Sequence, residues 1–345
     1  MNNSFFYNGR GSLELTDRIL SLIQDAELYI KTGNFLFQDV RVVEALIEAM
    51  GRGVAVFILS NTTQQENDSR PGRVEGHVDL QLPNLKELTR KGAHCRALDD
   101  LHAKFLIVDG QDGLLMSANF SPNSIEGNIE TGVLLKEDEV ADLEFVFDNL
   151  YMNADVQRIF GTDSKTAILR SKKPLPSETF SREHIKSNLR LTIVGQERKG
   201  RQSNLANCNV MTLYQEILNI ISRAKERIDI VTWHFSAIDN LPELVQELRS
   251  AIARGVKVRL YSNHVQDNTS LPESLKCIAS LKQFGCEHVG DGQNHSKAVI
   301  TEGEGIILTA NIDGNHGLKG GFEVGCVLKG ERLEEMRTFV ESLFV

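Results

Sequence analysis

The sequence predicts an α/β fold that is built as two similar halves. Helical and strand patterns alternate along the chain, and the same order of patterns occurs twice. Each half opens with a helical apolar pattern that leads into a strand, at residues 18–35 and again at residues 214–235. Alternation of this kind predicts helices on both sides of a sheet. A repeat that spans a whole half predicts two related structural units.

The next two elements of each half are an amphipathic helix and a strand of branched residues. They lie at residues 42–61 in the first half and 244–263 in the second, with apolar residues near three- and four-residue spacing in the helix. Both helices end in Arg-Gly-Val, where Gly53 and Gly255 suit a left-handed cap. Both strands close in Ser-Asn. The polar segments that follow are expected to be loops that face a substrate, at residues 62–80 and 264–274.

The length of 345 residues suits two units of about 150 residues each. The repeat assigns them to residues 1–160 and 205–345, with residues 161–204 as a basic connector. That segment holds ten basic and four acidic residues, so it carries +6 while the rest of the chain carries −15. Within it, residues 190–194 have the composition of a strand.

Composition excludes several classes of protein. A hydrophobic fraction of 41% with 27 glycines is typical of a folded globular chain. The longest apolar run, Val54–Leu59, is far shorter than the ~20 residues that cross a bilayer, and the N-terminus lacks the pattern of a secretory signal. We therefore expect a cytoplasmic protein without integral membrane association. The five cysteines contain no CxxC pair, so reduced thiols are expected, with no metal site and no cofactor.

A polar constellation is repeated in both halves. The first copy comprises His102, Lys104, Asp109, Ser117, Asn119 and Glu130, and the second comprises His295, Lys297, Glu302, Thr309, Asn311 and Glu323. The interval from His to the last Glu is 28 residues in both copies. His and Lys two apart in an extended segment point to the same face. Two halves that face each other would therefore supply two imidazoles and two ammonium groups to one surface.

This set of groups suits phosphoryl chemistry. Two Lys and two Asn aimed at the non-bridging oxygens of a phosphodiester stabilise the charge that develops there. One neutral imidazole can attack phosphorus, and the other can protonate the leaving oxygen. A carboxylate bonded to the second nitrogen of each imidazole would fix its tautomer, and we assign this role to Glu130 and Glu323.

At these residues the sequence resembles the phospholipase D superfamily, whose signature HxKxxxxD is followed by a Gly/Ser-x-Asn element, usually twice in one chain. The first copy matches in full, whereas the second has Glu302 for Asp and Thr309 for Ser. The resemblance implies one two-lobed α/β/α unit with a single site at a pseudo-twofold interface and catalysis without a metal. It also implies that His102 is the nucleophile and His295 the acid and base.

Other members of the constellation are given supporting roles. Ser117 and Thr309 are expected to support phosphate binding. Asp109 and Glu302 each precede a glycine at a strand end, which favours a structural role as a turn cap. Trp233 and His234 close the first strand of the second half and are expected to pack at the core or rim, with contact to a base or lipid as the alternative.

The leading hypothesis is a phosphodiesterase that acts on DNA or RNA through a phosphohistidine. The alternatives are a phospholipase D or phosphatidyl transferase acting on phospholipid, and a catalytically silent scaffold that binds nucleic acid. Basic residues of the first loop and of the connector are candidate nucleic-acid contacts, with solvated surface charge as the other interpretation: Arg70, Arg73, Lys172, Lys173, Arg198, Lys199 and Arg201. The sequence leaves the oligomeric state open, because one chain already holds both copies of the motif.

Overall fold

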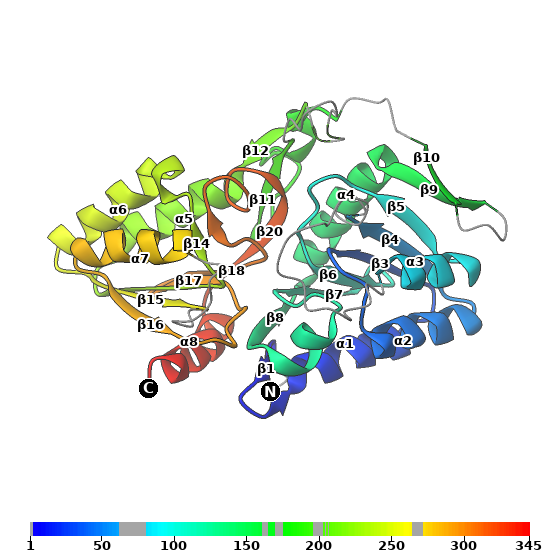
Figure 1. Cartoon of the computed structure of the whole chain (residues 1–345), viewed down its shortest axis with the longest axis horizontal. Coiled ribbons are helices and arrows are strands. Elements are labelled where there is room, and N and C mark those ends of the chain that lie inside the picture. The colour runs from blue at the N-terminus through cyan, green and yellow to red at the C-terminus, as the bar shows by residue number, and fades with distance from the viewer. Residues whose placement is uncertain are drawn as a thin grey trace.

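The computed structural model confirms the α/β class and the two-halved organisation (Figure 1). It describes residues 3–61, 81–160, 165–169, 175–195, 203, 205, 207–263 and 272–345. Two large sheets dominate the described part, one of ten strands and one of eight, with a small two-stranded sheet beside the second.

The first sheet has the strand order β10-β9-β5-β4-β3-β6-β7-β8-β1-β2. In chain order the elements of this half are β1 (Phe5–Gly9), β2 (Ser12–Leu13), α1 (Glu14–Asp25), β3 (Tyr29–Asn34), α2 (Val40–Gly51), β4 (Ala55–Ser60), α3 (Gln81–Arg90), β5 (His94–Ala97), β6 (Phe105–Val108), β7 (Asp112–Met116), the π-helical turn η1 (Asn123–Gly127), β8 (Glu130–Leu134), α4 (Glu137–Asn153), β9 (Asp155–Phe160) and β10 (Lys165–Leu169).

The second sheet has the order β12-β11-β20-β18-β17-β13-β15-β16, and β14 pairs with β19 beside it. Its elements are the 3-10 turn η2 (Ser177–Phe180), β11 (Leu189–Val194), β12 (Asn209–Met211), α5 (Thr212–Arg223), β13 (Arg227–Thr232), β14 (Phe235–Ser236), the 3-10 turn η3 (Ile238–Asn240), α6 (Pro242–Ala253), β15 (Lys257–Ser262), α7 (Pro272–Gln283), β16 (Glu287–Gly290), β17 (Ala298–Thr301), β18 (Gly305–Leu308), β19 (Ile312–Asp313), β20 (Gly321–Leu328) and α8 (Glu331–Leu343).

Residues 161–204, expected to form a basic connector, contribute strands to both sheets in their described part. β10 pairs with β9 in the first sheet, and β11 pairs with β20 in the second. The strand that residues 190–194 indicated is thereby confirmed. Of the two expected loops, residues 62–80 and 264–271 lie outside the described residues. α7 begins at Pro272, so the second loop, expected to reach residue 274, ends earlier.

Three buried clusters form the core. One packs α1, α2 and α3 on the outer face of the first sheet, and another packs α5, α6 and α7 on the outer face of the second. The third lies between the sheets and joins side chains of α4 and α8 to strands of both halves. Because the middle cluster draws on both halves, burial of apolar surface holds the two sheets together.

The repeat is visible in how equivalent helices end. Arg52, after α2, donates to the last carbonyls of α1 at Ile23 and Gln24. Arg254, after α6, makes the same contacts to the end of α5. The next residue in each case is a glycine with positive φ, at Gly53 and Gly255, which confirms the left-handed caps.

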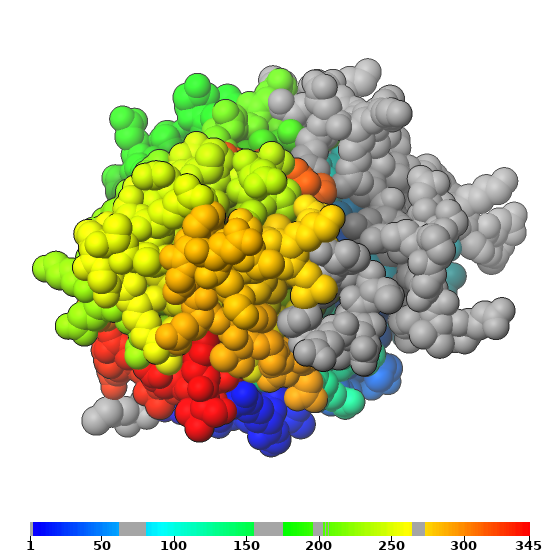
Figure 2. Space-filling view, turned by 60° about the vertical axis from the view of Figure 1, so that its left-hand side comes forward, coloured from blue at the N-terminus to red at the C-terminus, as the bar shows by residue number. Residues whose placement is uncertain are grey.

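Helices of the middle layer cross between the halves. α8 of the second half lies against β1 of the first, and Figure 2 shows the red C-terminal helix beside the blue N-terminal residues. In the same layer, Arg332 of α8 forms a buried ion pair with Glu139 of α4, with nitrogen–oxygen distances of 2.6 and 2.7 Å. Glu139 also accepts the backbone N–H of Lys136 and the side-chain amide of Asn188, and such hydrogen bonds help to make buried charge tolerable.

Two short backbone bridges at the interface lead directly to the repeated motif. Leu101 pairs with Phe322 of β20, and Ile129, just before β8, pairs with Asn294. Each bridge joins the segment that precedes one motif histidine to the strand that carries the motif glutamate of the other half. The five cysteines are free and buried. In the part of the chain that the structure describes, every helix is too short or too polar to cross a bilayer.

Substitution of Gly321 tests how much the Leu101–Phe322 bridge contributes to the stability of the protein. Its φ is +84°, and a Cβ at this position would lie 2.6 Å from the carbonyl oxygen of Asp100. We expect Gly321→Ala to lower the free energy of unfolding by about 1–3 kcal/mol, because the backbone is strained and the bridge must open. Chemical denaturation measures this difference.

The matched control is Gly51→Ala at the end of α2, where an added Cβ meets nothing within 4 Å. This variant should unfold within about 0.5 kcal/mol of the parent. Equal stability of the two variants would contradict the close approach at the interface.

Candidate active site

The motif histidines and lysines lie in extended segments directly before β6 and β17. Between His102 and Lys104, Ala103 is fully buried on the opposite face, which agrees with the expected alternation. The amide of Ala103 donates to the carbonyl of Phe322 in the other half at 2.8 Å. The amide of His102 donates to the same carbonyl at 3.1 Å, and in the equivalent place the amide of His295 donates to the carbonyl of Ile129 at 2.9 Å. Each motif segment is therefore held by a strand end of the opposite half.

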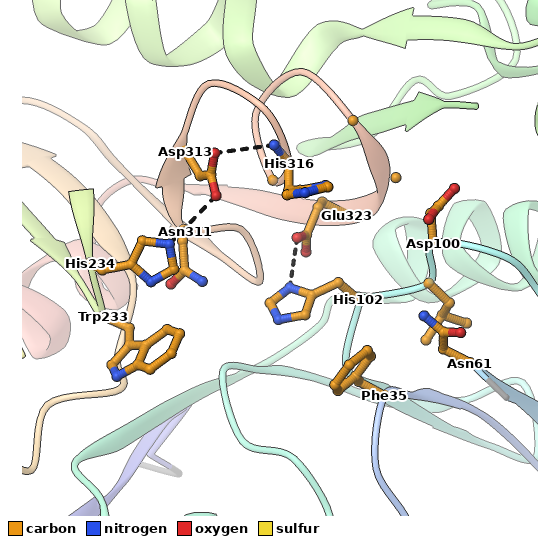
Figure 3. A pocket seen from close by; sticks show the side chains of 14 residues that line it. Phe35, Asn61, Asp100, His102, Trp233, His234, Asn311, Asp313, His316 and Glu323 are labelled. Carbon is orange, nitrogen blue, oxygen red and sulfur yellow. Dashed lines mark hydrogen bonds and ion pairs between the residues drawn. The ribbon is translucent and has the colours of Figure 1, made fainter. Parts of the chain in front are cut away.

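Because of these bridges, each histidine meets the glutamate of the other half. His102 Nδ1 lies 2.7 Å from Glu323 Oε1, and His295 Nδ1 lies 2.7 Å from Glu130 Oε1 (Figure 3 shows the first pair). Both carboxylates are buried, with 1% or less of the side chain exposed. A carboxylate accepts a hydrogen bond from Nδ1–H, so the other ring nitrogen, Nε2, is left to act on a ligand.

The hydroxyls of the motif hold these carboxylates. Ser117 Oγ donates to Glu130 Oε2, and Thr309 Oγ1 donates to Glu323 Oε2. Each hydroxyl also accepts the backbone N–H of the residue after that glutamate, at 2.9 Å for Ser117 and 3.0 Å for Thr309. Both side chains are fully buried. The contact that the structure contains is thus with a carboxylate, and support of a phosphate by these residues stays a prediction.

Lys104 and Lys297 are fully buried, and each ammonium donates to the backbone carbonyl of its own motif histidine. Burial lowers the pKa of Lys104 to about 7, where Glu323 and Glu130 oppose the shift and Lys297 adds to it. Burial likewise lowers the pKa of Lys297 to about 8 against the pull of the two glutamates. Both lysines therefore sense both carboxylates across the interface.

Burial is also the largest influence on the imidazoles. It lowers the pKa of His295 to about 4 and holds the pKa of His102 below its ordinary value, although the paired glutamate raises each one in part. Lys297 acts on His102, and Lys104 acts on His295. Electrostatic coupling in both directions means that the two motif copies form one cluster of charges.

Burial alone would raise the pKa of Glu130 and Glu323. The imidazoles and ammonium groups beside them outweigh this effect, and both pKa values lie below the ordinary value. The carboxylates are therefore ionised, as their role as acceptors from Nδ1–H requires.

A cavity of about 370 Å³ opens onto the cluster and is lined by both halves. Its lining includes His102, Glu323, Asn311 and the aromatic side chains of Phe35 and Trp233 (Figure 3). The imidazole of His102 lies 5.5 Å from the Phe35 ring, and that of His295 lies 5.7 Å from the Trp233 ring. Each motif histidine thus has an aromatic neighbour, directly after β3 in the first half and directly after β13 in the second.

The two asparagines are buried beside the cluster, with 8% of Asn119 and 7% of Asn311 exposed. In both, the buried Oδ1 has no hydrogen-bond partner among the residues that the structure describes. An unpaired amide oxygen in such a place is costly, and it marks a position where a ligand or a water molecule would add a contact.

Asp109 and Glu302 do not line the cavity. Asp109 accepts three backbone N–H groups, from Glu27, Leu28 and Tyr29, at 2.7–2.9 Å. Glu302 accepts the backbone N–H groups of residues 225–227 in the equivalent place. Burial would raise both pKa values, but these donors outweigh it and hold them below the ordinary value. The two side chains join the start of a strand to the end of its neighbour.

The structure adds residues to the site that sequence reasoning missed. Asn61, Asp100, His234, Asp313 and His316 also line the cavity. The repeated Ser-Asn and the place of His234 at a strand end were available signals, whereas nothing in the sequence marked the other side chains. Phe235 packs in the core, while Trp233 and His234 face the cavity.

The candidate nucleic-acid contacts cannot be placed on this site. Arg70, Arg73, Lys172, Lys173, Arg198, Lys199 and Arg201 all lie outside the described residues. Within the described ranges, no group of three or more His, Cys, Asp or Glu side chains is arranged to hold a metal ion.

Comparison with known proteins agrees with this geometry. The sequence matches the family described as "Cardiolipin synthase, PLD-like domain" over residues 19–151 and 217–343. The chain belongs to this family and is a phosphodiesterase-like member of the phospholipase D superfamily. Each of the two matched ranges contains one copy of the motif.

Individual relatives are distant. Human protein FAM83B is 22% identical over 199 residues, which cover 56% of this chain and 20% of that protein, so the chain spans about a fifth of its length. Phosphatidylserine synthase from Haemophilus influenzae Rd KW20 has a similar structure, with a TM-score of 0.65 at 12% identity over 100% of this chain and 86% of that chain. Polyphosphate kinase from Porphyromonas gingivalis gives a TM-score of 0.59 at 12% identity over 99% of this chain and 50% of that one. At this identity, the structures show a shared fold alone.

The contact across the interface predicts how His102 titrates. Because Glu323 raises the pKa of His102, Glu323→Gln should lower that pKa further. NMR titration of the imidazole carbon–hydrogen signals measures the change. The control is Glu126→Gln, a carboxylate that is 62% exposed and pairs with Arg41 on the surface. An unchanged or higher pKa of His102 in Glu323→Gln would contradict the pairing.

Proposed function

We propose that the chain is a metal-independent phosphodiesterase that cleaves DNA or RNA through a phosphohistidine. One observation carries the proposal: two His–Glu pairs, each made from both halves, enclose two buried lysines in a single cluster. Two acid–base groups beside two cations are what a phosphoryl transfer with a covalent intermediate needs.

The nucleophile in this proposal is His102. With Nδ1–H donating to Glu323, the lone pair of Nε2 is free for attack on phosphorus. The His102 side chain is 28% exposed and lines the cavity, whereas that of His295 is 13% exposed. The more accessible imidazole is the better candidate for direct attack, and its lowered pKa keeps it neutral and nucleophilic at neutral pH.

The first step forms a bond between His102 Nε2 and phosphorus and breaks the bond to the leaving oxygen. Protonated His295 gives its proton to that oxygen and becomes neutral. In the second step, His295 takes a proton from water while the water oxygen attacks phosphorus, and the nitrogen–phosphorus bond breaks. His102 and protonated His295 are then restored, so protons and bonds balance over the cycle.

The lysines stabilise charge throughout this cycle. A bound phosphodiester brings a negative charge next to Lys104 and Lys297, which raises the lowered pKa of each and strengthens its cationic form. The same negative charge favours the protonated form of His295. Substrate binding therefore supplies the charge that the buried cluster otherwise lacks.

Support for nucleic acid as substrate comes from the cavity wall. Phe35 and Trp233 lie beside the two motif histidines, and aromatic rings in such places stack on bases. Asn61, His234 and His316 give the rest of the wall hydrogen-bonding groups. The description of the matching family as cardiolipin synthase favours phosphatidyl transfer as the second candidate.

A substrate panel in EDTA tests the proposal. We expect cleavage of single-stranded DNA or RNA, and a loss of about 10³-fold or more in His102→Ala and in His295→Ala, since each removes a reacting group. Acid-labile labelling of the protein by a radioactive diester should depend on His102. The control variant is His184→Ala, whose ring stacks on Phe145 in another part of the chain.

Either of two results would contradict the proposal and favour another function. Release of headgroup from phospholipid vesicles, with nucleic acid left intact, would identify the lipid activity. Binding of nucleic acid without turnover, unchanged in both histidine variants, would indicate a scaffold.

The rate should fall as pH rises from about 6.5 to about 9. Lys104 and Lys297 hold the phosphate as cations, and with pKa values of about 7 and about 8 they lose that charge in this range. His295, whose pKa in the free protein is about 4, is largely neutral throughout this interval, and its small protonated fraction falls further as the pH rises. We expect kcat/KM to decrease by at least about tenfold over this interval, measured with a small diester in chelator. A rate that is flat or rises above pH 8 would contradict these assignments.

A further inference from the structure

The pseudo-twofold repeat provides an internal comparison between the two sides of the cavity. The pairing of β3 with β4 ends at Asn34 and Ser60, and that of β13 with β15 ends at Thr232 and Ser262. Counting on from these ends makes Phe35 the equivalent of Trp233, in agreement with their ring contacts to His102 and His295. The next residue is Leu36 in the first half and His234 in the second.

A second pair of positions follows in the same way. Phe37 bridges Phe120 in the first half, and Phe235 pairs with Ile312 in the second. The residue after each partner is Ser121 in the first half and Asp313 in the second. Where the first half has leucine and serine, the second has an imidazole and a carboxylate.

These two side chains form a pair in the wall of the cavity. His234 Nε2 lies 3.5 Å from Asp313 Oδ2, and both residues line the cavity (Figure 3). Asp313 is largely buried and also accepts the backbone N–H groups of Asn315 and His316, at 2.8 and 3.2 Å. Three donors fix the carboxylate, and the carboxylate in turn fixes the imidazole.

The pair lies on the side opposite the proposed nucleophile. Figure 3 shows the His102 imidazole extending into the cavity from one side, with His234, Trp233 and Asn311 on the other. In a displacement at phosphorus, the leaving oxygen lies roughly in line with the attacking atom and on the far side of phosphorus. The arm of the diester that leaves therefore points toward the wall that carries His234.

We propose that His234, oriented by Asp313, is a specificity-determining residue whose Nε2–H donates to an oxygen of the leaving arm of the substrate. This nitrogen can turn to a substrate because its contact with Asp313 is long, at 3.5 Å, whereas Nδ1 is buried. This inference rests on the proposed function and deepens it. The motif groups are the same in both halves and cannot distinguish the two arms of a diester. The His234–Asp313 pair occurs on one side, so it makes the two sides of the cavity chemically different. In a polynucleotide, the oxygen belongs to the sugar of the leaving nucleoside or to the next phosphate.

The test compares substrates that differ in the leaving arm. Thymidine p-nitrophenyl phosphate releases p-nitrophenolate, the dinucleotide TpT releases a nucleoside, and the trinucleotide TpTpT releases an arm with a further phosphate. His234→Leu copies the residue of the first half and should lower kcat/KM for the trinucleotide about tenfold, the effect of one lost hydrogen bond to a charged group. The nitrophenyl ester should react within about twofold of the parent rate.

The dinucleotide identifies the source of the oxygen. A tenfold loss with TpT assigns the contact to the sugar, and a loss confined to TpTpT assigns it to the next phosphate. His234→Gln keeps a hydrogen-bond donor and should recover part of the loss. Asp313→Ser, which copies Ser121, should show the same substrate dependence as His234→Leu.

An equal loss on all three substrates in His234→Leu would overturn the inference, because it would indicate a merely structural role. No loss on either nucleotide would overturn it as well. In both cases a parent protein that turns over the nucleotides leaves the proposed function intact. A parent protein that turns over none of the three would overturn the proposed function, and this inference with it.

Discussion

The reciprocal contact between each motif histidine and the glutamate of the other half is the constraint on which the site depends. Four charged or chargeable side chains of the cluster, Lys104, Lys297, Glu130 and Glu323, are almost completely buried. Isolated charges of this kind are costly to remove from water, and pairing is what makes them tolerable. The pairs exist only when both halves are docked, so the fold and the site are completed by the same contact.

The backbone explains why the pairs cross. The bridges Leu101–Phe322 and Ile129–Asn294 place each histidine segment against a strand of the opposite half. Gly321, with its positive φ and its close approach to Asp100, allows one of these contacts. The apolar cluster between the sheets includes Leu101, Ala103, Ile129 and Phe322 next to the motif residues, and burial lowers the pKa values of the imidazoles and lysines.

Much of this was predictable from the sequence, because the spacing of residues indicates which side chains share one face of a helix or strand. The alternation of helices and strands, the two halves, and the repeated set from His102 to Glu130 and from His295 to Glu323 follow from patterns in the chain. The exchange of glutamates between halves does not, since no spacing records which strand lies across an interface. The hydroxyl contacts of Ser117 and Thr309 to the glutamates lie within one half, and the sequence assigned these hydroxyls to phosphate support instead. His234 and Asp313 are 79 residues apart, so no local pattern indicates that they form a pair.

The most direct test of the account is a set of double-mutant cycles on the free energy of unfolding, which combine each motif histidine with each motif glutamate. The account predicts coupling of about 1 kcal/mol or more for His102 with Glu323 and for His295 with Glu130. It predicts coupling within about 0.5 kcal/mol of zero for His102 with Glu130 and for His295 with Glu323. Strong coupling confined to histidine and glutamate of the same half would contradict it.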